Sequence, residues 1–291
     1  SSKVGHLAGV VETMAAIDSL EACDAHLASF ACLGVLKWRG VSRSWLQRFS
    51  CGKVWGQLHK LGLDFTGCRL NPRVWTLMAK LQPEGLTEMA LNLTKCAVSH
   101  QSAYALSQTF PASLQRLQLV LFQSGVRQQG ALSIARSLPC GLKKLHLDFD
   151  DCDIRNEGAT ELSRHLPKAL QQLSLSFEHC RITHLGAGPI CSVIQSLREL
   201  VTLELRFQEC PIGKELLHAT AMTYPGTLKA LTLDFSVSCL GNENVAALTA
   251  QLPQGLQEFH LEFVGCGVGD PGVLAIAEGM PPNLIVVSLD L

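Results

Sequence analysis

The stretch LKKLHLDFDDCDI, residues 142–154, carries the pattern that decides the fold. Leu145, Leu147 and Phe149 alternate with polar residues, and a period of two predicts a short strand with one apolar face. From residue 158 to residue 166, small and apolar residues recur at a period nearer 3.6, which predicts an amphipathic helix. One strand followed by one helix is therefore the structural unit of this part of the chain.

The same unit recurs along most of the chain. Its first leucine returns with a period of about 28 residues, and only the step from Leu170 to Leu200 is slightly longer. The nine copies begin at Leu58, Leu86, Leu114, Leu142, Leu170, Leu200, Leu228, Leu256 and Leu284. Proline, which cannot continue a helix, recurs at one place in the repeat, as Pro111, Pro139, Pro167, Pro225, Pro253 and Pro281. Such units stack with their strands paired in parallel, so the sequence predicts an α/β solenoid.

The phrase L-x-x-L-x-L resembles the leucine-rich repeat, and its length is similar to that of the ribonuclease-inhibitor-like class. The resemblance covers residues 58–291. It implies eight full repeats plus a ninth strand, with a parallel sheet on the concave face and helices on the convex face. The family usually places its Cys or Asn two residues earlier, and the extra pair brings in a phenylalanine. We interpret it as a longer strand that ends in an aromatic spine of Phe65, Phe149, Phe177, Phe207, Phe235 and Phe263.

The cysteines follow the repeat. Of twelve, six share one column, namely Cys68, Cys96, Cys152, Cys180, Cys210 and Cys266. Ser124 and Ser238 occupy the column in two other copies, so we expect a small side chain that bonds to turn backbone. Side chains in one column point the same way, which disfavours disulfide geometry. Free structural thiols indicate a reducing compartment, cytoplasmic or nuclear, and an organelle reached after removal of a transit peptide is also compatible.

The strand residues between the buried ones would line the concave face, and the resemblance implies that this face binds protein. These positions include ten acidic and four basic residues, so the face carries −6 whereas the whole chain carries −1. A basic protein segment would relieve the repulsion between stacked carboxylates. A merely solvated surface is the alternative. The predicted partner-binding residues are Asp64, Glu88, Asp148, Asp150, Glu178, Glu204, Arg206, Asp234, Glu258, Glu262 and Asp290.

Composition and motifs exclude several other classes of function. Lys and Arg number 24 against 25 Asp and Glu, which argues against binding to nucleic acid through bulk positive charge. The longest uncharged stretch of membrane character, Leu27 to Leu36, is half a bilayer span, so we predict no membrane-spanning segment. No motif of a nucleophile elbow, a zinc protease or a phosphate-binding loop occurs. We therefore predict no enzyme activity and no cofactor.

A metal site is a weaker alternative at His146, Asp148 and Asp150, which share one strand face. Alternate residues of a strand are roughly 7 Å apart. That spacing is too long for easy sharing of one ion, so we predict no metal site.

Residues 1–57 break the repeat and hold three of the four tryptophans. We expect them to form a helical cap over the first repeat. Residues 27–58 also resemble the second half of an F-box, chiefly through Val41-Ser-Arg-Ser-Trp45. This resemblance implies a substrate receptor that docks a Skp-type adaptor of a cullin ubiquitin ligase. The implied adaptor-binding residues are Leu27, Phe30, Leu36, Val41, Trp45 and Trp55.

The opposite end suggests a third interpretation. Leu284–Leu291 would be a ninth strand with no helix after it. An uncovered apolar strand edge is prone to association. We therefore expect either a trimmed chain or a structural accessory subunit whose last strand is covered within a larger complex.

Overall fold

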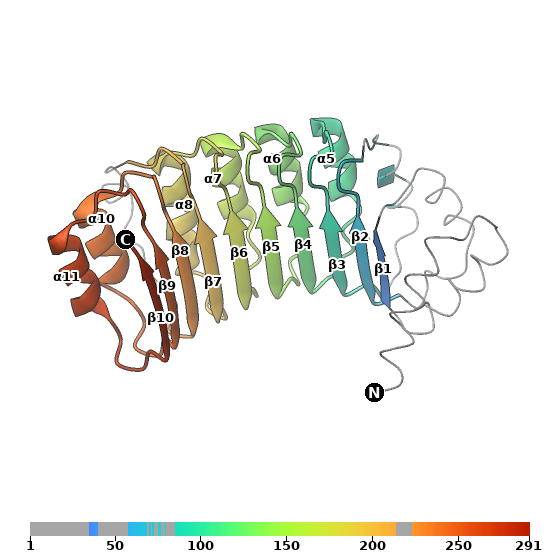
Figure 1. The fold of residues 1–291 in the computed structure, drawn as a ribbon. Coiled ribbons are helices and arrows are strands. Elements are labelled where there is room, and N and C mark those ends of the chain that lie inside the picture. The colour runs from blue at the N-terminus through green and yellow to red at the C-terminus, as the bar shows by residue number, and fades with distance from the viewer. Residues whose placement is uncertain are drawn as a thin grey trace.

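The structure, a computed structural model, describes residues 35–39, 58–68, 70, 72, 75, 76, 79, 85–213 and 223–291. Within these residues, ten parallel strands form one sheet in chain order, so neighbours in sequence are neighbours in space (Figure 1). The strands are β1 (Val35–Arg39), β2 (Lys60–Asp64), β3 (Glu88–Asn92), β4 (Arg116–Val120), β5 (Lys144–Asp148), β6 (Gln172–Ser176), β7 (Thr202–Arg206), β8 (Ala230–Asp234), β9 (Glu258–Glu262) and β10 (Val286–Asp290).

The described helices connect successive strands and cover one face of the sheet, while the other face stays open (Figure 1). They are α5 (His100–Ser107), α6 (Gln128–Arg136), α7 (Arg155–His165), α8 (His184–Ile194), α10 (Gly241–Thr249) and α11 (Asp270–Gly279). The predicted solenoid of strand, turn and helix is thereby confirmed. None of the helices in these ranges has the length and apolar character needed to cross a bilayer.

The repeat aligns like residues side by side, because each strand pairs with the next in constant register. Leu145 of β5 lies beside Leu173 of β6, and Leu147 beside Leu175. These leucines are buried between sheet and helices, as the period of two predicted. The phenylalanines that follow β5 to β8 stack with successive ring centroids 5.9, 5.3 and 5.3 Å apart, and the ring after β9, Phe263, meets Phe235 edge-on at 6.0 Å.

The extra residue pair lengthens the hydrogen-bond ladder and not the strand. Each strand has five residues, yet pairing continues past its end. The amide of Phe149 donates to the Ser176 carbonyl at 2.9 Å, and that of Asp151 donates to the Glu178 carbonyl at 2.8 Å. The expected longer strand is therefore replaced by a paired turn that begins at the phenylalanine.

The cysteine column bonds one repeat to the one before it. The Cys180 thiol donates to the Phe149 carbonyl at 2.9 Å, and the Cys210 thiol donates to the Phe177 carbonyl at 3.0 Å. The thiols of Cys96, Cys152, Cys180, Cys210 and Cys266 are free. Ser238 also bonds to turn backbone, as expected, but it donates to the Phe235 carbonyl of its own repeat. The hydroxyl is shorter than the thiol and reaches only the nearer carbonyl.

The sheet begins earlier than the sequence predicted. β1 lies within the segment expected to be a helical cap, and it pairs in parallel with β2, placing Leu36 beside Leu61. The helical prediction is wrong for these five residues, and the described sheet has one strand more than the nine expected. The step from Leu36 to its partner Leu61 is shorter than the step from Leu61 to Met89, so a search at the constant period of the repeat misses β1.

The F-box-like interpretation is mostly untested by the fold. Leu36 lies in a strand and not in the helical motif that the interpretation requires. The other predicted adaptor-binding residues lie outside the described residues: Leu27, Phe30, Val41, Trp45 and Trp55. At the opposite end, β10 pairs with β9, and its Val286, Val287 and Leu289 are about 40% exposed.

Candidate functional site

The open face of the sheet is lined by four rows of side chains. They come from the first, third and fifth residue of each strand and from the second residue after it, since these alternate with the buried residues. We call these the face positions. The constant register aligns them across the sheet, so that the fifth residues of neighbouring strands form one row. From β5 to β10 this row reads Asp148, Ser176, Arg206, Asp234, Glu262 and Asp290.

Charge is unevenly divided along the face. On β2–β4, which we call the balanced half, the face positions hold two acids and two bases, a net charge of zero. On β5–β10, the acidic half, they hold eight acids against two bases, a net charge of −6. The acids are Asp148, Asp150, Glu178, Glu204, Asp234, Glu258, Glu262 and Asp290. The surplus predicted for the whole face therefore lies on β5–β10 alone.

The balanced half neutralises its own charge. Glu88 of β3 forms ion pairs on both sides, with the Lys60 ammonium at 2.8 Å and the Arg116 guanidinium at 3.4 Å. The hydrogen bond from Lys60, together with the charge of Arg116, holds the pKa of Glu88 below its usual range despite partial burial. This carboxylate is a structural tie between three strands.

The acidic half leaves most of its carboxylates without a cation. Arg206 pairs with Glu204 of its own strand, with Nη2 and Oε1 2.7 Å apart. Glu204 also accepts from the Ser174 hydroxyl at 2.7 Å, and that hydroxyl lies 2.9 Å from Nδ1 of His146. Among the described residues, no Lys or Arg forms an ion pair with the other seven acids.

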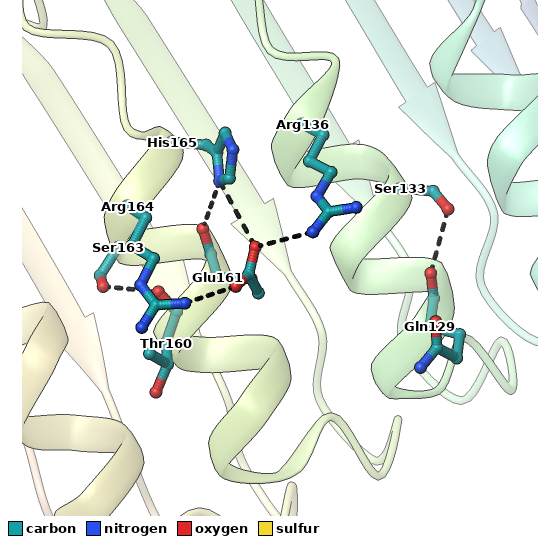
Figure 2. A network of polar contacts seen from close by, with 8 residues as sticks. All are labelled: Gln129, Ser133, Arg136, Thr160, Glu161, Ser163, Arg164 and His165. Atoms are coloured by element: carbon teal, nitrogen blue, oxygen red, sulfur yellow. Dashed lines mark hydrogen bonds and ion pairs between the residues drawn. The ribbon is translucent and has the colours of Figure 1, made fainter.

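On the helix-covered face, one carboxylate is surrounded by cationic side chains (Figure 2). Glu161 of α7 is held by the Arg164 guanidinium at 2.6 Å and by Arg136 of α6 at 3.5 Å, and His165 lies 3.8 Å away. These contacts lower the pKa of Glu161, with the Arg164 hydrogen bond as the largest cause. Glu161 thus has the cationic partners that most carboxylates of the acidic half lack.

Some residues in the row of fifth residues have a structural role that the sequence analysis did not assign. Oδ1 of Asp148 accepts the amide of Asp150 at 3.1 Å, and Asn92 makes the equivalent bond to Thr94 at 3.1 Å. Asp234 does the same for Ser236 at 3.0 Å and is only 3% exposed. At these positions of the row an Asx side chain satisfies a turn amide, and Asn serves as well as Asp.

The sequence and the fold both match known proteins with repeated leucines. A family model described as leucine-rich repeat matches residues 144–163 and 260–277, which hold β5 with most of α7 and the end of β9 with most of α11. The chain is a leucine-rich repeat solenoid. No curated protein matches its sequence. Proteins built from this repeat generally serve as binding scaffolds without catalytic activity.

Two solved structures resemble the leucine-rich repeat solenoid at low identity. A chain of the crystal structure of the Rad7 and Elc1 complex in yeast aligns with a TM-score of 0.51 and 19% identity over 84% of this chain. Our chain spans 65% of that chain's length. The leucine-rich repeat protein LegL7 from Legionella pneumophila aligns with a TM-score of 0.44 and 14% identity, over 87% of this chain and 82% of that one.

Two carboxyl groups of the solenoid's acidic half resist ionisation. Burial, and then the neighbouring charge of Asp150, raises the pKa of Asp148. Burial also raises the pKa of Glu178, and the charges of Asp150, Asp151 and Glu209 add to this effect. Raised values mean that the ionised forms are poorly stabilised by the solenoid itself, so a cation brought by another molecule would be favoured there.

The sequence analysis overlooked two apolar residues on the solenoid's concave face. Val120 lies beside Asp148 in the register, and Phe122 lies beside Asp150, because the backbone pairing continues past β4. Both side chains are partly exposed. The signal was present in the sequence, since Phe122 is the only Phe, Tyr or Trp among the described face positions of β2–β10.

Potential metal ligands meet at a place different from the one considered in the sequence. Atoms of Glu178, His179 and Glu209 lie within 4.8 Å of one another, at the turns after β6 and β7. Nε2 of His179 is 3.3 Å from a Glu209 oxygen and 3.8 Å from a Glu178 oxygen. All three side chains are at least one-third exposed, so we treat the group as part of the acidic surface.

Proposed function

We propose that this leucine-rich repeat solenoid is a non-enzymatic interaction scaffold whose acidic half binds a basic segment of a partner protein. The observation that supports the proposal is the charge of −6 on the face positions of β5–β10, with seven of eight carboxylates lacking a Lys or Arg partner. Neighbouring strands are roughly 4.8 Å apart, so these charges repel one another at distances shorter than the screening length of physiological salt. A partner with Lys and Arg side chains would relieve that repulsion.

The test is to neutralise three carboxylates without disturbing the fold. Asp148→Asn keeps the turn bond that Asn92 already makes, and Glu178→Gln and Glu262→Gln preserve side-chain size. Asp234 is left intact because it is buried and bonds to Ser236. The probe is a labelled peptide in which Lys and Arg alternate with Ser. We expect the triple variant to bind it roughly tenfold more weakly, and its affinity to fall with added salt.

A matched control removes the same charge elsewhere. Glu157→Gln, Glu199→Gln and Glu278→Gln alter three exposed acids that are not face positions. This control should bind the peptide as tightly as the unaltered chain. Equal weakening by both triple variants, or no binding of any basic peptide to the unaltered chain, would contradict the proposal.

An F-box-type substrate receptor is the second candidate function. The observation that favours it is the likeness in fold to a chain of the Rad7 and Elc1 complex, which is itself an assembly of two proteins. In this proposal the N-terminal segment docks a Skp-type adaptor through residues that include Val41 and Trp45. Pull-down of the adaptor by the full chain, and its loss with Trp45→Ala, would support this function. Failure to capture the adaptor would leave the scaffold without a ligase role.

A structural accessory subunit is the third candidate, favoured by the exposed apolar side chains of β10. A constant stoichiometry with fixed partners through purification would support it. For the compartment we propose a reducing one, cytoplasmic or nuclear, because the column thiols donate hydrogen bonds as free thiols. Burial also raises the pKa of Cys96 to about 11 and that of Cys191 to about 12, so these thiols stay protonated and unreactive at neutral pH.

A further inference from the structure

The boundary between the balanced and the acidic half combines an aromatic ring with carboxylates. Phe122 follows β4, and its backbone neighbour across the sheet is the turn that carries Asp150. Val120 lies beside Asp148 in the row of fifth residues. In the next repeat, the backbone amide of Glu178 donates to Oδ1 of Asp150 at 2.7 Å. This bond holds the Asp150 carboxylate in place.

A ring beside two carboxylates is better suited to binding an arginine side chain than a lysine side chain. A guanidinium is planar, stacks on an aromatic face and donates two parallel hydrogen bonds to carboxylates. Its aliphatic stem can cover a small apolar side chain such as that of Val120. A lysine ammonium can pair with the carboxylates, but it lacks the plane that stacks on the ring.

We propose that the junction of β4 and β5 is an anchor for an arginine of the bound segment, with Phe122 under the guanidinium and Asp148 and Asp150 paired with it. This inference rests on the proposed function and names the chemistry of its partner. Aromatic residues at the centre of a binding face commonly supply most of the affinity. Phe122 follows the fourth of the ten described strands, between the turns that follow β3 and β5.

A second contact follows from the row of fifth residues. β6 presents Ser174 and Ser176, which are short and uncharged, and β7 presents Arg206, which would repel a basic residue. The next exposed carboxylates, Glu258 and Glu262, lie on β9, four strands beyond β5. That separation is roughly 19 Å. An extended segment that crosses the strands would place its second basic residue roughly five to seven positions from the anchor arginine, with a non-basic residue over Arg206.

The experiment compares peptides of equal charge. The first holds two arginines roughly six residues apart in a Gly and Ser background. The second holds the same two arginines side by side, and the third replaces both by lysine at the wide spacing. We expect the first peptide to bind the full chain roughly tenfold more tightly than the second, because only the first can reach both contacts without repulsion from Arg206.

Variants of the chain then locate the anchor. Phe122→Leu keeps an apolar side chain but removes the ring, and should weaken the first peptide about fivefold while changing the lysine peptide less than about twofold. Asp148→Asn with Asp150→Asn should weaken the first peptide roughly tenfold. The matched control is Glu157→Gln with Glu278→Gln, which removes two exposed acids that are not face positions and should leave this affinity unchanged.

The outcomes separate this inference from the proposed function. Equal binding of all three peptides, with Phe122→Leu silent, would overturn the anchor while the neutralised triple variant could still weaken binding and support the basic segment. No binding of any of the three peptides would overturn both. Weakening by the control pair to the same degree as by the Asp148 and Asp150 pair would also overturn the anchor.

Discussion

The balanced half and the acidic half share one scaffold but differ both beneath and above the sheet. After β3 and β4 the buried residue is Leu93 or Leu121, whereas after β5 to β9 it is a phenylalanine in ring contact with its neighbours. On the open face, the first half cancels its charges and the second accumulates acids. The row of rings therefore follows the same strands that carry the surplus of acids on the open face.

Removal of one ring from the spine should have the largest effect on stability. Phe177 stacks on Phe149 and Phe207, at 5.9 and 5.3 Å. Phe177→Ala should lower the free energy of unfolding by about 3–5 kcal/mol, through the cavity it leaves. Phe177→Leu, which copies the balanced half, should cost about 1–2 kcal/mol. Urea unfolding followed by circular dichroism measures both, and equal costs would show that stacking adds nothing to apolar volume.

The helix layer should show a smaller contrast between the halves. A Cβ at Gly186 of α8 would lie 2.9 Å from the Asn156 backbone Cα, whereas at Gly130 of α6 it would meet the Val126 and Ala103 side chains at 2.9 and 3.1 Å. Backbone yields less readily than side chains, so Gly186→Ala should cost about 1–2 kcal/mol. Gly130→Ala should be near neutral, because the helix propensity of alanine offsets the crowding.

Gly226→Ala is the control for the pair, since no atom lies within 4 Å of the added methyl. Thermal unfolding of the three variants under one condition would rank them. A larger loss at Gly130 than at Gly186 would contradict the idea that contact with backbone makes Gly186 the costlier site.

Neutralisation of one acid in each half should change stability in opposite directions. Glu88→Gln breaks the ties to Lys60 and Arg116 and should destabilise the chain by about 0.5 kcal/mol. Asp148→Asn keeps the bond to the Asp150 amide and removes a charge that burial and Asp150 disfavour, so it should stabilise by about 0.5 kcal/mol. Chemical denaturation near neutral pH is the measurement, and a shared sign would contradict the division of the face.

The pH dependence of these differences is the finest test. The raised pKa of Asp148 means that stability is highest below its unfolded pKa and is lost as pH rises through the folded value. The gain from Asp148→Asn should therefore vanish in acid. The lowered pKa of Glu88 means that its contribution is present above its unfolded pKa and disappears as pH falls through the folded value, so the loss from Glu88→Gln should vanish there too.

The pKa of Asp148 also responds to the charges of three neighbours, His146, Asp150 and Arg206. These residues must therefore stay unaltered in every variant compared. Titration of the free energy of unfolding from about pH 7 to about pH 3 covers the window set by ordinary Asp and Glu values. A gain from Asp148→Asn that grew as pH fell would contradict the assigned cause of the shift.

The sequence predicted the strands and the core because a repeat of nearly constant length forces equivalent residues into register. The same register predicted which acids share a face. It could not reveal β1, whose step to β2 is shorter than the repeat and whose identity as a strand depends on pairing with β2. It also missed Phe122, because a partly exposed aromatic in a polar row looks like an irregularity until its neighbour Asp150 is known.

The linear pattern alone determined that this chain stacks strand–helix units, because the apolar spacing is local and recurs. Which carboxylates serve the fold and which remain available was decided only in three dimensions. Asp234 and Glu262 lie side by side in one row and carry the same charge, yet the first is buried against its own turn and the second is exposed. The difference arises because the burial of a side chain depends on the neighbouring repeats, which no single repeat encodes.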